Sequence, residues 1–250
     1  VLKSSAPITA IRFLSSLVQP IIALIIPARL MAAGYTASQA MSIFGIAIGM
    51  TLPLLFIPIT LVGSISTALI PDISAAVSNE DDKHVNNRIS SSIIITMFIA
   101  FFMIPLFIGA GENIGTFFFG NATSGALLAG AAWIVLPMAL TNITSSMLNA
   151  LGMEVKSFVN YLVGSVFLFL SIWFLPTVIG IRALIVGMGT CVSITSILNI
   201  WMIKRKTKIK LNILKPFVLM ALFTIPSAAI TFFTTNLLTD VIPLFFNLAI

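Results

Sequence analysis

Apolar runs of membrane-spanning length recur along the whole chain, and they constrain its fold more than any other feature. A bilayer crossing needs about 20 predominantly apolar residues. Runs of this kind, separated by short polar loops, lie at 6–32, 42–66, 89–110, 124–151, 158–179, 183–203 and 217–238, and a last one begins at Val241. Within a bilayer each run must satisfy its own backbone hydrogen bonds, so we expect helices throughout. The sequence predicts an all-α polytopic membrane protein with about seven full spans and the start of an eighth.

Composition excludes a water-soluble protein. Hydrophobic residues make up 59% of the chain and charged residues only 8%, too little polar surface for a water-facing exterior. The net charge of +6 is more typical of cytoplasmic loops than of a nucleic-acid-binding surface, so no nucleic acid partner is expected. Cys191 is the single cysteine, which leaves no disulfide framework and no cysteine metal site. The apolar chain ends at Val1 and Ile250 favour a piece of a longer protein.

The distribution of basic residues predicts the orientation of the spans. One set of loops holds Lys3, Lys83, Arg88, Lys156 and six further cations within 204–215, whereas the other holds only Arg29 and Arg182. Positive loops mark the cytoplasmic face, so the chain start and the loop 204–215 are expected there. The expected organisation is a six-helix transmembrane lobe at 1–203, a polybasic cytoplasmic linker at 204–216, and at 217–250 one more transmembrane helix and the start of a truncated one. The linker is interpreted as a topology determinant, with binding of anionic lipid as the alternative.

A polar seam on the first span is the main candidate functional feature. Residues spaced by three and four positions share one helix face, and here they are Arg12, Ser16, Gln19 and Ala23. Pro20 interrupts the same helix and frees backbone carbonyls. A cation at membrane depth either snorkels to the headgroups or faces a cavity or substrate path. The combination of a cation, an amide and a proline favours a cavity lining.

Weaker seams follow on later spans. They consist of Asn142, Ser146 and Asn149 on the fourth span and of Asn160, Gly164 and Ser171 on the fifth. Small and polar residues of this kind more often serve helix packing and interhelical hydrogen bonds, which is the interpretation we favour for both. Gly45 and Gly49 on the second span form a small-xxx-small pair, which predicts a close helix contact.

The titratable residues do not suggest an enzyme. The carboxylates are expected in loops or at helix ends; they are Asp72, Glu80, Asp81, Asp82, Glu112, Glu154 and Asp240. The single histidine, His84, is expected to be solvated in a loop at 79–88. No nucleophile with its base, phosphate-binding glycine loop or metal cluster is visible, so we expect neither catalysis nor a cofactor or metal.

Several short motifs resemble one group of membrane transporters. They are PARLMAAG at 27–34, FG at 44–45, GMTLP at 49–53 and LIPDIS at 69–74, then LNALG at 148–152, Asn160, Pro176, GI at 180–181 and GT at 189–190. The first group resembles the stage V sporulation protein B family. The second resembles the wider multidrug/oligosaccharidyl-lipid/polysaccharide (MOP) exporter superfamily. The resemblance covers essentially the whole chain, but RALIVG at 182–187 departs from it, because family members commonly carry small residues there.

The resemblance implies the C-terminal half of a MATE/MOP-like transporter, beginning at the seventh of fourteen spans. In the superfamily two six-helix lobes surround a central cavity, lined by the first, second and fourth spans of each lobe, and the lobes rock between inward-open and outward-open states. The implied cargo is a lipid-linked saccharide, and for the sporulation branch it is the peptidoglycan precursor of spore cortex. The expected activity is therefore that of a flippase in the cytoplasmic membrane.

On this basis the predicted substrate-binding residues are Arg12, Gln19, Ser16, Asn142, Asn149 and Arg29. Arg12 would bind the pyrophosphate of the prenyl-linked sugar, since a guanidinium grips phosphate in bidentate fashion. Arg29 suits an interface anchor equally well. Membrane lipids and cell-wall synthesis proteins are the further partners expected.

Two alternatives remain at this point. A cation-coupled multidrug antiporter of the same superfamily would need a membrane carboxylate, which this half does not offer at mid-membrane. A non-transporting scaffold for cell-wall synthesis would tolerate neutralisation of Arg12. Fold alone does not separate the three.

Overall fold

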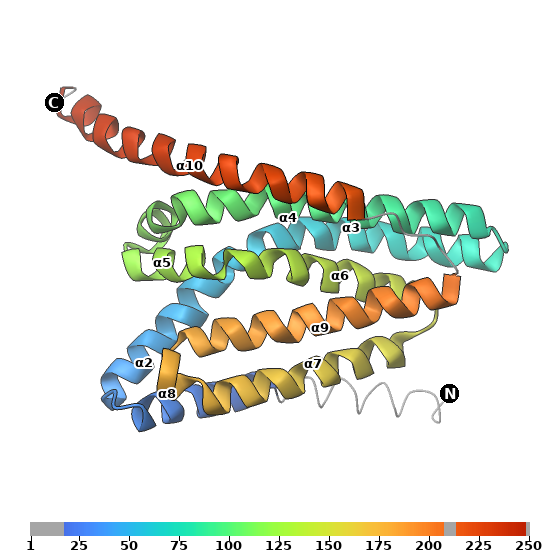
Figure 1. The fold of residues 1–250 in the computed structure, drawn as a ribbon, viewed down its shortest axis with the longest axis horizontal. Coiled ribbons are helices and arrows are strands. Elements are labelled where there is room, and N and C mark those ends of the chain that lie inside the picture. The colour runs from blue at the N-terminus through green and yellow to red at the C-terminus, as the bar shows by residue number, and fades with distance from the viewer. Residues whose placement is uncertain (1–17, 208–213, 249–250) are drawn as a thin grey trace.

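The computed structural model describes residues 18–207 and 214–248, with side chains up to Thr235 (Figure 1). After a first helix, Val18–Ala32, the elements are α2 (Ala37–Ile46), η1 (Ala47–Thr51), α3 (Leu52–Ser78), α4 (Asp82–Phe119), α5 (Ala122–Ala131), η2 (Ala132–Ile134), α6 (Val135–Ala150), α7 (Glu154–Phe174), α8 (Pro176–Ile179), α9 (Arg182–Thr207) and α10 (Leu214–Leu248). The described part contains no strand. Six helical segments are long and apolar enough to cross a membrane, which confirms the predicted all-α multi-pass membrane protein.

These segments match the expected spans and extend them. The second span was expected at 42–66, but α2, η1 and α3 form one helical segment of 42 residues, Ala37–Ser78. It is followed at once by α4 with 38 residues. The expected loop at 79–88 therefore shrinks to 79–81. The carboxylate of Asp81 accepts a hydrogen bond from the backbone N–H of His84 at 3.0 Å, a side-chain cap that begins α4 early.

His84 consequently lies in the first turn of α4 and not in a solvated loop. Its Nε2 is 3.3 Å from Asp72 Oδ1, and Arg88 Nε is 2.7 Å from Asp72 Oδ2. Asp72 belongs to the last turns of α3, so this cluster ties the end of α3 to the start of α4. The predicted loop is wrong because the helix continues through the hydrophilic sequence, whereas the side chain of His84 is 40% exposed, as expected for a solvated residue.

The buried side chains form two clusters. One joins α3, α4, α5 and α6, with Ile73, Ile93, Leu128 and Ile143 among its fully buried members. The other joins the first helix, α2, α7 and the start of α9. α9 packs against both α6 and α7, and the long segment α2–η1–α3 passes from the second cluster to the first (Figure 1).

Basic residues gather at one end of the bundle. The α3–α4 turn, the α6–α7 turn and the end of α9 all lie at that end (Figure 1). They carry Lys83, Arg88, Lys156, Lys204, Arg205 and Lys206. The last three were expected in a linker at 204–216, but they form the last turn of α9, which ends at Thr207. Lys3 lies outside the described residues.

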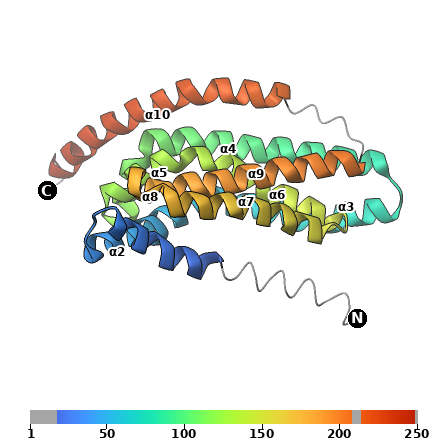
Figure 2. The same ribbon diagram turned by 60° about the horizontal axis from the view of Figure 1, so that its bottom comes forward.

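α10 lies on the outside of the bundle. It runs along the outside of α4, and none of its most apolar window is buried (Figure 2). The sequence predicted a new segment from Val241, yet α10 continues through this position to Leu248 as one helix.

Candidate functional site

The first helix packs through one face and leaves the predicted seam uncovered. Val18, Ile22, Ile26 and Leu30 are buried in a cluster that includes Leu168 and Ile172 of α7. Gln19 and Ala23, on the seam, are exposed. Arg12 and Ser16 lie outside the described residues. Within the described part, the polar face of this helix is therefore free of neighbouring helices.

The second helix has an equally open face. A Cβ added to Gly45 or Gly49 would meet no described atom within 4 Å. The close helix contact predicted for this glycine pair is therefore wrong within the described part of the chain. Because these glycines carry no side chain, the backbone is exposed on this face within the described part of the chain.

The backbone changes its hydrogen-bond spacing beside this face. Ala47–Thr51 is π-helical, and the N–H of Leu52 bonds to the carbonyl of Ala47, five residues back. Pro53 follows directly and has no N–H, so it cannot donate the α-helical bond to the carbonyl of Gly49. π-helical turns of this kind often occur at functional sites and are a common cause of bends in helices.

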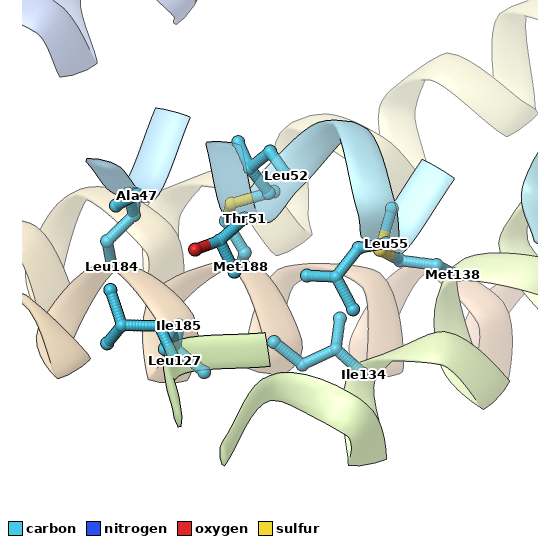
Figure 3. Close-up of a pocket in the computed structure, with 10 residues that line it drawn as sticks. All are labelled: Ala47, Thr51, Leu52, Leu55, Leu127, Ile134, Met138, Leu184, Ile185 and Met188. Atoms are coloured by element: carbon cyan, nitrogen blue, oxygen red, sulfur yellow. The ribbon is translucent and has the colours of Figure 1, made fainter. Parts of the chain in front are cut away.

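A small cavity lies beside the π-helical turn (Figure 3). Its volume is about 20 Å³, and its walls come from Ala47, Thr51, Leu52, Leu55, Leu127, Ile134, Met138, Leu184, Ile185 and Met188. The hydroxyl of Thr51 donates to the carbonyl of Ser124 at 3.1 Å, which leaves an apolar interior. A space of this size holds about one water molecule. It is a packing defect next to the π-helical turn, far too small for a saccharide.

The seam on α6 joins helices. Asn142 Oδ1 accepts a hydrogen bond from the Ser66 hydroxyl of α3 at 3.0 Å. Thr141 donates to the carbonyl of Val192 on α9 at 2.8 Å. Asn149 is exposed in the last turn of α6, toward the basic end. The packing interpretation of this seam is confirmed at Asn142, and the structure does not bring Asn142 and Asn149 into one site with Gln19.

The fifth-span seam has a buried partner that sequence reasoning missed. Asn160 Nδ2 donates to Asn199 Oδ1 at 2.8 Å, and both side chains are buried. Asn199 Nδ2 lies 3.2 Å from Thr144 Oγ1 and 3.0 Å from Ser145 Oγ. The packing interpretation is therefore confirmed for Asn160. A lone asparagine in an otherwise apolar helix was the available signal for Asn199.

Arg29 is held by α7. Its Nε donates to the carbonyl of Trp173 at 2.7 Å, and the guanidinium carbon lies 5.1 Å from the centre of the Trp173 ring. A second pair of this type, Arg205 and Trp201, lies within α9 at 5.4 Å. These contacts fit the interfacial anchor that the sequence offered as the alternative role of Arg29.

Two of the carboxylates do not follow the prediction of loops and helix ends. Asp240 lies within α10, eight residues before its end at Leu248. Glu112 lies within α4, two turns before its end at Phe119, and is exposed. Among the described residues no group of three His, Cys, Asp or Glu side chains could hold a metal ion. No family model, curated protein or solved structure matches the chain significantly.

Proposed function

We propose that the chain is one lobe of a flippase that carries a lipid-linked saccharide across the cytoplasmic membrane by alternating access. The observation that carries this proposal is the uncovered face on the first two helices, which bears Gln19, Gly45 and Gly49. The side-chain amide of Gln19 is costly against lipid tails. A face of this composition suits a water-filled cavity shared with a second lobe.

The packing of the bundle in two buried clusters supports a change in the relative positions of its helices. The two buried clusters are connected through α9 and through the long segment α2–η1–α3. The π-helical turn of that long segment lies between Ala40 of the second cluster and Leu54 of the first. Alternating access requires helices that change their relative positions around a fixed site. The π-helical turn is a place where a change in bending costs few hydrogen bonds.

The site we propose combines residues of the first helix with the open backbone of the second. Arg12 binds the pyrophosphate, because a guanidinium offsets the desolvation of phosphate oxygens in the membrane. Ser16 and Gln19 bind sugar hydroxyls. Arg29 is an anchor in this arrangement, since its Nε and ring contacts hold it to α7. The overall arrangement would be the MATE/MOP-like fold that the motifs resemble.

The test measures transfer of a fluorescent prenyl-pyrophosphate saccharide between the leaflets of liposomes that hold the full-length protein. Arg12→Ala should lower the rate about tenfold or more, the scale of a lost charge-assisted hydrogen bond. Arg182→Ala is the matched control, because Arg182 is an exposed arginine at the start of α9. Unchanged transfer in Arg12→Ala, at normal expression, would refute the assigned site.

The same liposomes separate the other function classes. Uptake of a cationic dye under an ion gradient, without saccharide transfer, would identify a drug antiporter. In that case Glu112 becomes the first carboxylate to neutralise, because it lies two turns inside α4. No transport of either cargo, with unchanged accessibility of Gln19 in both orientations, would indicate a scaffold.

A further inference from the structure

α10 packs along α4, and two specific contacts are prominent. Near the start of α10, the rings of Phe217 and Phe101 meet edge to face with 5.5 Å between their centres. Farther along, Gly109 of α4 lies against Thr231, and Thr235 Oγ1 donates to the Gly109 carbonyl at 3.2 Å. The absence of a side chain at Gly109 permits this second approach, since an added Cβ would lie 2.7 Å from Thr231 Cβ.

Between these two contacts the helices enclose a groove of about 590 Å³. Its walls are Phe98, Phe101, Phe102, Pro105, Leu106, Met220, Phe223, Pro226, Ser227, Ile230 and Thr231. A proline lies in each helix within the groove, where it removes a backbone hydrogen bond and bends the helix. α10 follows a curved path along α4 (Figure 2).

The lining offers no free hydrogen-bond donor. Its only side-chain hydroxyls are used within α10, where Ser227 donates to the Phe223 carbonyl at 2.6 Å and Thr231 donates to the Ser227 carbonyl at 2.8 Å. Phe98, Phe102 and Phe223 remain largely exposed along the groove. The chemistry therefore favours a hydrocarbon chain over a sugar, because the lining offers no hydrogen-bond partner to sugar hydroxyls.

Lys215 lies at one end of the groove, and three further cations lie at the same end of the bundle. Lys215 is exposed in the first turn of α10, and Lys204, Arg205 and Lys206 are exposed at the end of α9. In the described part of the chain none of the four forms a salt bridge. The groove between Met220 and Ile230 is about 15 Å long at 1.5 Å per residue, close to half of a bilayer's hydrocarbon thickness. A lipid with its phosphate near Lys215 would therefore place one chain in the groove.

We propose that the α4–α10 groove and these four cations form a binding site for an anionic phospholipid of the leaflet at the basic end. One acyl chain fills the groove between Pro105 and Pro226. The phosphate and the headgroup charge interact with Lys215 and the end of α9. A zwitterionic lipid with the same chains fits the groove but lacks the net charge.

The test compares binding of phosphatidylglycerol and phosphatidylcholine with identical acyl chains to the full chain in detergent, measured by native mass spectrometry. Phosphatidylglycerol should bind more tightly. Lys215→Gln and Lys204→Gln should each weaken that preference about fivefold, the effect of removing one basic residue at an anionic surface. Lys156→Gln is the matched control, because Lys156 is an exposed lysine at the same end on α7.

Ser227→Phe should fill the groove and lower the affinity for both lipids. Leu222→Phe adds a ring to α10 outside the lining and should leave binding unchanged. Ser227→Leu serves as the second variant if the larger ring disturbs folding, which a thermal unfolding curve reveals. An unchanged lipid preference in both lysine variants, or full binding in both Ser227 variants, would overturn the proposal. The proposal would also be overturned if a polyprenyl phosphate displaced bound phosphatidylglycerol and phosphatidylglycerol could not displace the polyprenyl phosphate.

Discussion

The side-chain amide of Asn160 on α7 donates to that of Asn199 on α9 across 2.8 Å, and Asn199 donates in turn to Thr144 and Ser145 on α6. One buried asparagine thus joins three helices. Because no water competes for these groups inside the bundle, the contact fixes the rotation of α9 relative to both neighbours. The contact belongs to the packing of the lobe, in contrast to the open face of the first two helices.

Asn199→Leu should destabilise the lobe. It keeps the branched shape of the side chain but leaves the Asn160 amide without its partner, which costs about 1–2 kcal/mol in a membrane bundle. Thermal unfolding in detergent measures the change. Asn87→Leu is the control, because Asn87 is exposed in the early turns of α4. Equal melting temperatures for the two variants would contradict a structural role for Asn199.

Two sets of glycines should respond in opposite ways to alanine. A Cβ at Gly164 would lie 2.5 Å from the Cys191 carbonyl oxygen and 2.6 Å from Thr195 Oγ1, so Gly164→Ala must push α7 away from α9. Gly45→Ala and Gly49→Ala meet no described atom within 4 Å and should stabilise the helix by about 0.5–1 kcal/mol. Melting temperatures of the three variants test this contrast. A large loss of stability in Gly49→Ala would show that another segment covers this face.

The same glycines show which features were predictable from sequence. Apolar runs and basic loops predicted the helices and the common basic end, because both follow from local composition. Gly45 and Gly164 carry equivalent local signals, yet only Gly164 faces a neighbouring backbone. Tertiary packing decides which helix lies opposite each glycine. A single sequence does not reveal that neighbour. The hydrogen bond between Asn160 and Asn199 could not be predicted for the same reason.

Local interactions explain the helix boundaries that differ from those predicted from the sequence. Asp81 caps α4 and carries the helix through His84, a hydrophilic sequence that composition assigned to a loop. At α9 the cations Lys204–Lys206 extend the helix past the apolar run, where they also interact favourably with its C-terminal dipole. The candidate site was only partly predictable: Gln19 is exposed as a cavity residue would be, whereas Arg29 is anchored to Trp173.

Arg29→Lys should lower stability more than Arg205→Lys. Both arginines lie over a tryptophan, but only Arg29 also donates to a backbone carbonyl, across 2.7 Å. Lysine cannot reproduce the planar guanidinium that makes both contacts at once. The expected losses are about 1–2 kcal/mol for Arg29→Lys and below about 1 kcal/mol for the exposed pair. Chemical unfolding followed by tryptophan fluorescence measures both, and equal losses would contradict the assignment of Arg29 as an anchor.

Pro53→Ala should reduce bending between α2 and α3. Alanine restores an N–H that can donate to the carbonyl of Gly49, so the π-helical turn loses its local cause and the α-helix can run through. Spin labels at Met41 and Leu61, both exposed, report the distance across the turn in a Cys191→Ala background. The variant should give a narrower and shifted distance distribution.

Pro71→Ala is the matched control for this experiment, since Pro71 lies inside α3 but beyond both spin labels. It should leave the distance unchanged. If the turn is the hinge of alternating access, Pro53→Ala should also slow saccharide transfer without loss of stability, because a continuous helix is the better hydrogen-bonded one. An unchanged distance distribution in Pro53→Ala would show that packing around Thr51, and not the proline, imposes the π-helical turn.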